Sequence, residues 1–172
     1  MKTVVGELVN LPAYRAVGLK WEGPYSEVPT LKEVIQHMST RVIELPHTKD
    51  LDMQLGLSYH LRPDGFVHFS VYEVEEEQEV PEGMLEIIVP AMLYLKVDHP
   101  KGKDIGATYT EIYKWFKNNE YQPLRETGVE YYDDLPIKHE RYPRGRDLND
   151  PHFEILIPVV KATPKVNEKR CQ

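Results

Sequence analysis

The sequence contains one cysteine in 172 residues, Cys171, which lies one position from its end. A single cysteine excludes an intramolecular disulfide and a zinc site built from thiolates, and this usage fits a reducing cytoplasm. Long apolar runs are also lacking. The segment 1–12 carries Glu7 and Asn10 among its apolar residues, so we expect no signal peptide, no membrane-spanning helix and no membrane partner.

Metal and cofactor motifs are equally scarce. The seven histidines are scattered, and no two have the spacing that places two metal ligands on one helix face. His60 and His68 can approach across a hairpin, where an ordinary cross-strand pair is favoured over a metal site. Neither a Walker motif nor a glycine-rich dinucleotide-binding motif occurs. We therefore expect no metal ion and no cofactor.

Basic residues are fewer than acidic ones. The chain has 21 lysines and arginines and 28 acidic residues, which gives a formal net charge of -7. A chain of this charge is not expected to bind a phosphate backbone directly, which argues against a nucleic-acid partner. Without six clustered glutamates the chain has 22 acidic and 21 basic residues. We interpret their segment as a solvated strand end and linker. The six are Glu73, Glu75, Glu76, Glu77, Glu79 and Glu82.

An internal repeat with an offset of 78 residues organises the chain. Leu11-Pro12-Ala13 matches Val89-Pro90-Ala91, and each triplet precedes an apolar run that predicts a strand. Residues 30–33 and 108–111 match at the same offset and share the Thr-x-x-Glu form of a capping box, which predicts helices that begin at Thr30 and Thr108. The apolar residues that follow recur with a helical period: Leu31, Val34, Ile35, Met38 and Val42, then Tyr109, Ile112, Tyr113 and Phe116.

Two further strands are predicted in each half. Residues 54–60 and 66–74 flank a Pro-Asp-Gly turn and predict a hairpin. In the second half, 128–132 and 152–155 resemble these two strands, and the long segment 133–151 replaces the turn. A connection of that length is typical of a functional or partly structured segment.

The predicted fold class is therefore α+β. We expect two tandem strand-helix-strand-strand units related by a pseudo-twofold axis, with an antiparallel sheet, both helices on one side and a central ligand groove. The expected domain spans residues 1–162, with repeats at 1–79 and 80–162, and residues 163–172 form a polar tail.

Aromatic residues are the candidates for the groove walls, and tyrosines concentrate in the second half. A buried phenol hydroxyl needs a hydrogen-bond partner, so tyrosine favours pocket walls over dry cores, whereas Phe116 is expected to pack on the sheet. The candidate ligand-binding residues are Tyr59, Phe69, Tyr109, Tyr113, Trp115, Tyr132 and Tyr142.

A carboxylate in such a groove is the most informative residue, because a buried negative charge needs a cation or hydrogen-bond donors. Glu130 and Glu140 each precede a tyrosine by two positions. In a strand, these two side chains share a face, so the phenol can hold the charge of the glutamate. Spacing alone favours solvent-facing glutamates, and both remain candidates.

Together these motifs resemble the GyrI-like small-molecule-binding family, also called the AraC-type effector-binding domain. The resemblance runs from residue 11 to residue 159 and depends on the order and spacing of motifs that are individually weak. They are Leu11-Pro12-Ala13 before Val17-Gly18-Leu19, Gly23-Pro24-Tyr25, residues 80–84 before Val89-Pro90-Ala91, residues 109–116 with Glu120-Tyr121-Gln122, the Glu-x-Tyr pairs, and residues 153–159.

The resemblance implies the duplicated fold with an aromatic groove and an acidic residue from the second half at its base. Counting from the helix end favours Glu130 as this residue, and counting back from the last strand favours Glu140. The ligand implied is an aromatic or cationic small molecule, such as a drug or xenobiotic. The chain resembles stand-alone members, which lack a helix-turn-helix module, and we expect a monomer or weak homodimer.

Some stand-alone members resemble hydrolases that open the cyclopropane ring of DNA-alkylating natural products, which would give the chain a role in drug resistance. In that case Glu130 or Glu140 would be the catalytic general base. The stretches 56–60 and 139–142 favour this branch. The alternative is a non-catalytic protein that sequesters drugs or regulates a partner, in the manner of a DNA gyrase inhibitor.

Overall fold

The computed structural model describes residues 6–162, so Cys171 and the expected tail lie outside the described residues. The first half contains β1 (Glu7–Leu11), β2 (Tyr14–Pro24), the 3-10 turn η1 (Tyr25–Glu27), α1 (Val28–Arg41), the 3-10 turn η2 (Val42–Glu44), β3 (Met53–Arg62) and β4 (Gly65–Glu73). The second half contains β5 (Leu85–Val89), β6 (Met92–His99), α2 (Ile105–Lys117), β7 (Tyr121–Pro123), β8 (Ile137–Pro143) and β9 (Phe153–Lys161).

The strands form one antiparallel sheet in the order β1-β6-β9-β8-β3-β4-β2-β5, with β7 paired to β9. Exchanging each strand with its counterpart in the other half reproduces this order in reverse, so the pseudo-twofold axis passes between β3 and β8. The first strand of each half pairs with a strand of the other half: β1 pairs with β6, and β5 pairs with β2. The predicted α+β fold with pseudo-twofold symmetry is confirmed, with this exchanged strand added to each unit.

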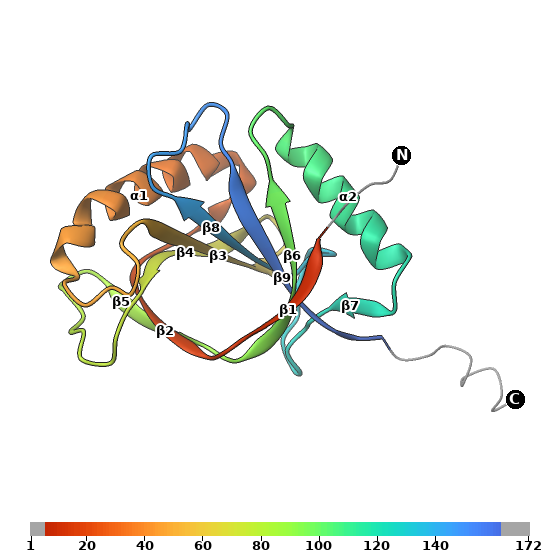
Figure 1. The fold of residues 1–172 in the computed structure, drawn as a ribbon, viewed down its shortest axis with the longest axis horizontal. Coiled ribbons are helices and arrows are strands. Elements are labelled where there is room, and N and C mark those ends of the chain that lie inside the picture. The colour runs from red at the N-terminus through yellow and green to blue at the C-terminus, as the bar shows by residue number, and fades with distance from the viewer. Residues whose placement is uncertain (1–5, 163–172) are drawn as a thin grey trace, which may run out of the picture.

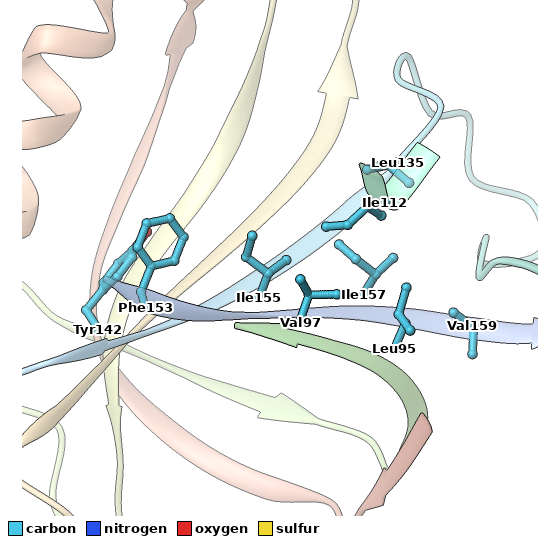
Figure 2. Close-up of a cluster of buried hydrophobic side chains, with 9 residues drawn as sticks. All are labelled: Leu95, Val97, Ile112, Leu135, Tyr142, Phe153, Ile155, Ile157 and Val159. Carbon is cyan, nitrogen blue, oxygen red and sulfur yellow. The ribbon is translucent and has the colours of Figure 1, made fainter. Parts of the chain in front are cut away.

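Both helices lie on the same side of the sheet, and the β8–β9 hairpin rises between them (Figure 1). On the other side, the two ends of the sheet curl toward each other. The helix side of the second half contains the largest hydrophobic cluster, in which the buried Ile112 of α2 meets Ile155 and Ile157 of β9. At one end of this cluster, Tyr142 and Phe153 lie side by side with ring centroids 5.6 Å apart (Figure 2).

The two prolines of the repeat separate strands. β1 ends at Leu11 and β5 ends at Val89, and each is followed directly by Pro12 or Pro90. Proline lacks a backbone N–H and cannot continue a hydrogen-bonded ladder. The edge strands β1 and β5 therefore end before these prolines, and the next strand begins a few residues later.

The predicted helix starts at Thr30 and Thr108 are wrong. α1 begins at Val28, and α2 begins at Ile105 after Asp104, whose carboxylate accepts a hydrogen bond from the Ala107 N–H at 3.0 Å. An aspartate at this position caps the first turn and suits the positive end of the helix dipole. Both threonines thus lie inside the first turn.

The matched threonines instead fasten each helix to the strand before it. The indole N–H of Trp21 donates to Thr30 Oγ1 at 2.9 Å, and His99 Nδ1 is hydrogen-bonded to Thr108 Oγ1 at 2.8 Å. Trp21 and His99 are themselves related by the 78-residue offset. The repeat therefore preserves a hydrogen bond between strand and helix, which satisfies polar atoms that would otherwise be buried without a partner.

Replacement of Thr108 tests this hydrogen bond. Thr108 and His99 are 0% and 1% exposed, so Thr108→Val keeps the side-chain shape and leaves His99 Nδ1 buried without a partner. We expect the free energy of unfolding to fall by about 1–3 kcal/mol in a urea titration. Thr110→Val, on the exposed side of the same helix, is the control and should change it by less than about 0.5 kcal/mol. Equal effects of the two substitutions would contradict a structural role for the hydrogen bond.

The predicted hairpin in the first half is confirmed as β3 and β4, whereas the strand predicted at 128–132 is wrong. Residues 128–132 form an exposed turn and loop, in which Gly128 has a φ of 81°. The strand that forms the second hairpin with β9 is β8, which lies inside the predicted connection 133–151. Because β8 is rich in charged residues, the sequence pattern did not indicate a strand. The acidic segment follows β4 as a loop in which the glutamates after Glu73 are exposed, whereas Gln78 is buried and accepts a hydrogen bond from the His47 N–H.

Candidate functional site

A groove with a volume of about 380 Å³ opens on the helix side of the sheet. It lies between α1, the first residue of α2 and the β8–β9 hairpin, and Glu140 is part of its lining. Apolar side chains of α1 form one wall, because the face that carries Leu31 points toward the sheet. The apolar lining residues include Val28, Leu31, Ile35, Ile105, Leu148 and Phe153.

Glu140 lies at the pseudo-twofold axis. It pairs with Gly56 in the β3–β8 ladder, and this is the middle of the seven residue pairs that join the two strands. Alternation along β8 places Lys138, Glu140 and Tyr142 on the helix side of the sheet and the residues between them on the other side. The central position of Glu140 therefore follows from the register of one strand pair.

Two tyrosine hydroxyls hold the Glu140 carboxylate. Tyr109 of α2 donates to Oε2, and Tyr142 of β8 donates to Oε1 at 2.5 Å. Burial, followed by the negative charge of Glu140, raises the pKa of both tyrosines well above the usual value, so both remain protonated donors. Hydrogen bonds to an ionised acceptor are stronger than neutral ones, which allows the carboxylate to lie at the base of an apolar groove.

The negative charge of Glu140 has no cation in direct contact. Among residues 6–162, no basic side chain forms an ion pair with it within 4.0 Å. Arg146 lies in the loop after β8, and its guanidinium carbon is over the Tyr142 ring, 4.0 Å from the ring centre. Burial lowers the pKa of Arg146, whereas the neighbouring Tyr142 and Glu140 favour its charged form.

Gly56 makes room for this arrangement. A Cβ atom on Gly56 would lie 2.7 Å from both Cε2 and the hydroxyl oxygen of Tyr142, and 2.9 Å from Cε1 of His68. Any larger residue would therefore push the Tyr142 ring away from its position beside Glu140. In the sequence, Gly56 indicated only the start of a strand-like stretch.

A second polar cluster lies toward the other end of β8. Asp133 accepts a hydrogen bond from the Tyr113 hydroxyl at 3.3 Å and forms an ion pair with Lys138 at 3.3 Å. Lys138 also lies over the Tyr109 ring, 5.4 Å from its centre. Burial, helped by the charge of Lys138, lowers the pKa of the nearby His60 to about 4, so this histidine is neutral at pH 7. The positive charge of Lys138 is therefore matched by Asp133 and leaves Glu140 unpaired.

The structure brings together four of the candidate residues named from the sequence. Tyr109, Tyr142 and Glu140 are in direct contact, and Tyr113 lies one turn further along α2. Glu130 is instead an exposed loop residue. Counting back from the last strand thus gives the glutamate at the base of the groove, because β8 lies inside the long connection.

The other candidate residues lie elsewhere. Tyr59 and Phe69 pack against each other on the opposite side of the sheet, with ring centroids 5.8 Å apart. Trp115 stacks on Tyr121 near the end of α2, and Tyr132 is 42% exposed in the loop before β8. None of these four residues lines the groove that contains Glu140.

Sequence reasoning missed the contribution of Arg146 and the apolar wall of α1. The helical period of Leu31 and Ile35 indicated a buried face, but it could not show that part of this face lines a groove. No local signal pointed to Arg146, because its place over Tyr142 depends on how the 144–152 loop folds back.

Within residues 6–162, no group of three or more histidine, cysteine, aspartate or glutamate side chains is arranged to hold a metal ion. Neither of the two described helices is long and apolar enough to cross a membrane.

Comparison with solved structures shows which proteins share this fold. A chain of EcmrR in a complex with DNA has a TM-score of 0.68 at 18% identity, covering 91% of this chain and 57% of that one. SAV2435 bound to tetraphenylphosphonium has a TM-score of 0.61 at 12% identity, covering 91% and 94%. A hydrolase from Listeria innocua has a TM-score of 0.53 at 10% identity, covering 91% and 92%. At these identities the likeness shows the fold alone.

Sequence comparison agrees with the fold. The chain is 27% identical over 163 residues to the transcriptional regulator BrlR of Pseudomonas aeruginosa, which covers 92% of this chain and 57% of BrlR. The chain thus spans little more than half of that regulator. The family model described as the GyrI-like small molecule binding domain matches residues 7–160. The chain belongs to the GyrI-like small-molecule-binding family.

Proposed function

We propose that the chain binds an aromatic, largely apolar cation in the groove between α1 and the β8–β9 hairpin, with Glu140 as the counter-charge. The observation that supports this proposal is a carboxylate held by two phenols at the base of an apolar groove, without an ion pair to any described residue. A half-buried anion without a counter-charge is stabilised by a cation that enters the groove.

The surrounding groups suit a large, weakly hydrated cation. The ring of Tyr142 lines the groove beside Glu140 and can add a cation–π contact of about 0.5–2 kcal/mol. The groove volume of about 380 Å³ falls within the range of small-molecule sites. SAV2435, which shares the fold, was solved with tetraphenylphosphonium, a cation of this class.

Calorimetric titration with tetraphenylphosphonium tests the proposal. The neutral triphenylphosphine oxide serves as the comparison, because it has similar aromatic bulk without the positive charge. We expect the cation to bind at least about tenfold more tightly, which corresponds to about 1.4 kcal/mol. Absence of binding, or equal affinity for both compounds, would refute the proposed role of Glu140 as a counter-charge.

Arg146 should oppose this binding. Its guanidinium lies over the Tyr142 ring, where a ligand cation would stack, and it brings a like charge into the groove. We expect Arg146→Ala to raise the affinity for tetraphenylphosphonium by about tenfold, since the ligand no longer displaces a cation from an aromatic face. Arg144→Ala is the matched control, because Arg144 is exposed in the same loop and pairs with Asp52 outside the groove. Weaker binding by Arg146→Ala would contradict this expectation.

Hydrolysis of a strained ring is a second candidate function, favoured by the presence of a proton acceptor and two protonated phenols in one groove. Glu140 would take a proton from water as the water oxygen bonds to a cyclopropane carbon. The ring C–C bond then breaks, and its electron pair moves onto a conjugated carbonyl oxygen that receives a proton from Tyr109 or Tyr142. Glu140 returns its proton to that tyrosine.

Incubation with a cyclopropane-containing alkylating agent distinguishes the two functions. Hydrolysis requires a hydrated, ring-opened product with the wild type and with Glu130→Gln, and none with Glu140→Gln. If the wild type forms no product, the binding function alone remains. The site offers no feature that favours a protein partner such as DNA gyrase.

We also propose that residues 1–162 act as a single domain of two repeats, 1–79 and 80–162, in the cytoplasm. The palindromic strand order supports this division, because each repeat completes the sheet of the other.

A further inference from the structure

A second cavity lies on the opposite side of the sheet, between its curled ends. It has a volume of about 140 Å³ and is lined by residues of β1, β2, β3, β4, β6, β8 and β9. Strand alternation sends the side chains of His139 and Arg141 of β8 to this side, whereas Glu140, which also borders this cavity, has its carboxylate hydrogen-bonded to Tyr109 and Tyr142 on the helix side. The sheet therefore separates this cavity from the groove described above. Its apolar lining residues include Leu11, Met53, Leu55, Leu57 and Leu156.

Two tyrosine hydroxyls in this cavity have no partner. Tyr94 is 1% exposed, and neither it nor Tyr14 makes a side-chain hydrogen bond to any residue in the described part of the chain. By contrast, the Tyr59 hydroxyl is hydrogen-bonded to His139 Nε2 at 3.1 Å. Neither hydroxyl is among the fully buried polar atoms that lack a partner, so both reach the accessible surface of the cavity and are free to donate to an acceptor on a bound molecule.

The charges of these groups point to a neutral ligand. Burial raises the pKa of Tyr94 to about 12 and that of Tyr14 further, so both hydroxyls remain protonated donors. Of the charged groups that line the cavity, Glu73 pairs with Lys49 at 3.6 Å and Arg141 lies 3.5 Å from Glu154, whereas the exposed Asp50 carboxylate accepts a hydrogen bond from the Asp52 N–H. The cavity thus offers two neutral donors beside its apolar side chains, with Asp50 at its exposed rim.

We propose that this cavity binds a small, neutral, mainly apolar molecule whose carbonyl oxygen accepts hydrogen bonds from Tyr14 and Tyr94. The volume of the cavity suits a small aromatic molecule of this class, because an apolar cavity of about 150 Å³ can hold a single benzene ring. This site lies on the other side of β8 from the proposed cation-binding groove, and Glu140 borders both. It gives the protein a ligand position on each side of β8.

Acetophenone is a suitable probe, with ethylbenzene as the analogue that lacks the carbonyl oxygen. We expect acetophenone to shift the NMR signals of residues around Leu57, and Tyr94→Phe to weaken its binding by about tenfold through the loss of one hydrogen bond. Ethylbenzene should bind more weakly, with the same affinity for both proteins. Binding of tetraphenylphosphonium by Tyr94→Phe should equal that of the wild type, which shows that the variant is folded.

A crystal soaked with 4-bromoacetophenone locates the site without a variant. An anomalous bromine peak between Tyr94 and Leu57 supports the proposal. The proposal is overturned by a cavity that holds ordered water only, by a peak beside Tyr109 on the helix side, or by equal acetophenone affinity of the wild type and Tyr94→Phe.

Discussion

Glu140→Gln should lower the affinity for tetraphenylphosphonium by about 30-fold or more, because truncating one partner of a desolvated charge pair costs about 2–5 kcal/mol. Glutamine keeps the size of the side chain and removes the negative charge at the base of the groove. Its amide can accept one phenol hydrogen bond, whereas its NH₂ group meets the second phenol as a donor. The loss should therefore be specific to charged ligands.

Glu130→Gln is the matched control for this result. It makes the same chemical change in an exposed loop and should leave the affinity unchanged. Triphenylphosphine oxide should bind Glu140→Gln and the wild type alike, since it carries no positive charge. If Glu140→Gln binds the cation as tightly as the wild type, Glu140 is not its counter-charge.

The free energy of unfolding should fall steeply as the pH decreases from about 6.5 to 4. Burial is the main cause that lowers the pKa of His60 and His68 to about 4 and that of His139 to about 3. The unfolded chain binds these protons near pH 6.5, before the folded chain does, so their contribution is complete above that pH and is lost below it. Each histidine lowers stability by up to about 1.4 kcal/mol per pH unit within this window.

Urea unfolding at pH 8, 6.5, 5 and 4 measures this loss. His139→Gln should reduce the slope by about one proton, because glutamine does not titrate. His37→Gln makes the same substitution at an exposed position on α1 and serves as the comparison. Constant stability between pH 6.5 and 5 would show that the histidines are not held neutral by the fold.

Most of the fold could be predicted because the repeat fixes which segments are equivalent. The Leu-Pro-Ala and Val-Pro-Ala triplets marked the same strand break in each half. The exchange of first strands could not be predicted, since β1 and β5 are short and their partners lie in the other half. The threonine pair was assigned to helix caps, because a sequence does not show that Trp21 and His99 lie within reach.

Part of the site could also be predicted from local spacing in the sequence. The Glu-x-Tyr spacing identified Glu140 and Tyr142 as neighbours, and Tyr109 was assigned to the correct helix face. Choosing between Glu130 and Glu140 required the position of β8, whose polar sequence hides its strand character. The sequence could not show that Gly56 lies opposite Glu140, since strand register depends on tertiary pairing.

A crystal structure with tetraphenylphosphonium tests the proposed function most directly. We expect the phosphorus between α1 and the β8–β9 hairpin, with a phenyl group over the Tyr142 ring within about 6 Å of its centre and Arg146 displaced toward solvent. Glu140 should keep its hydrogen bonds from Tyr109 and Tyr142. A cation bound between the curled ends of the sheet, or on a surface remote from Glu140, would contradict the proposed function.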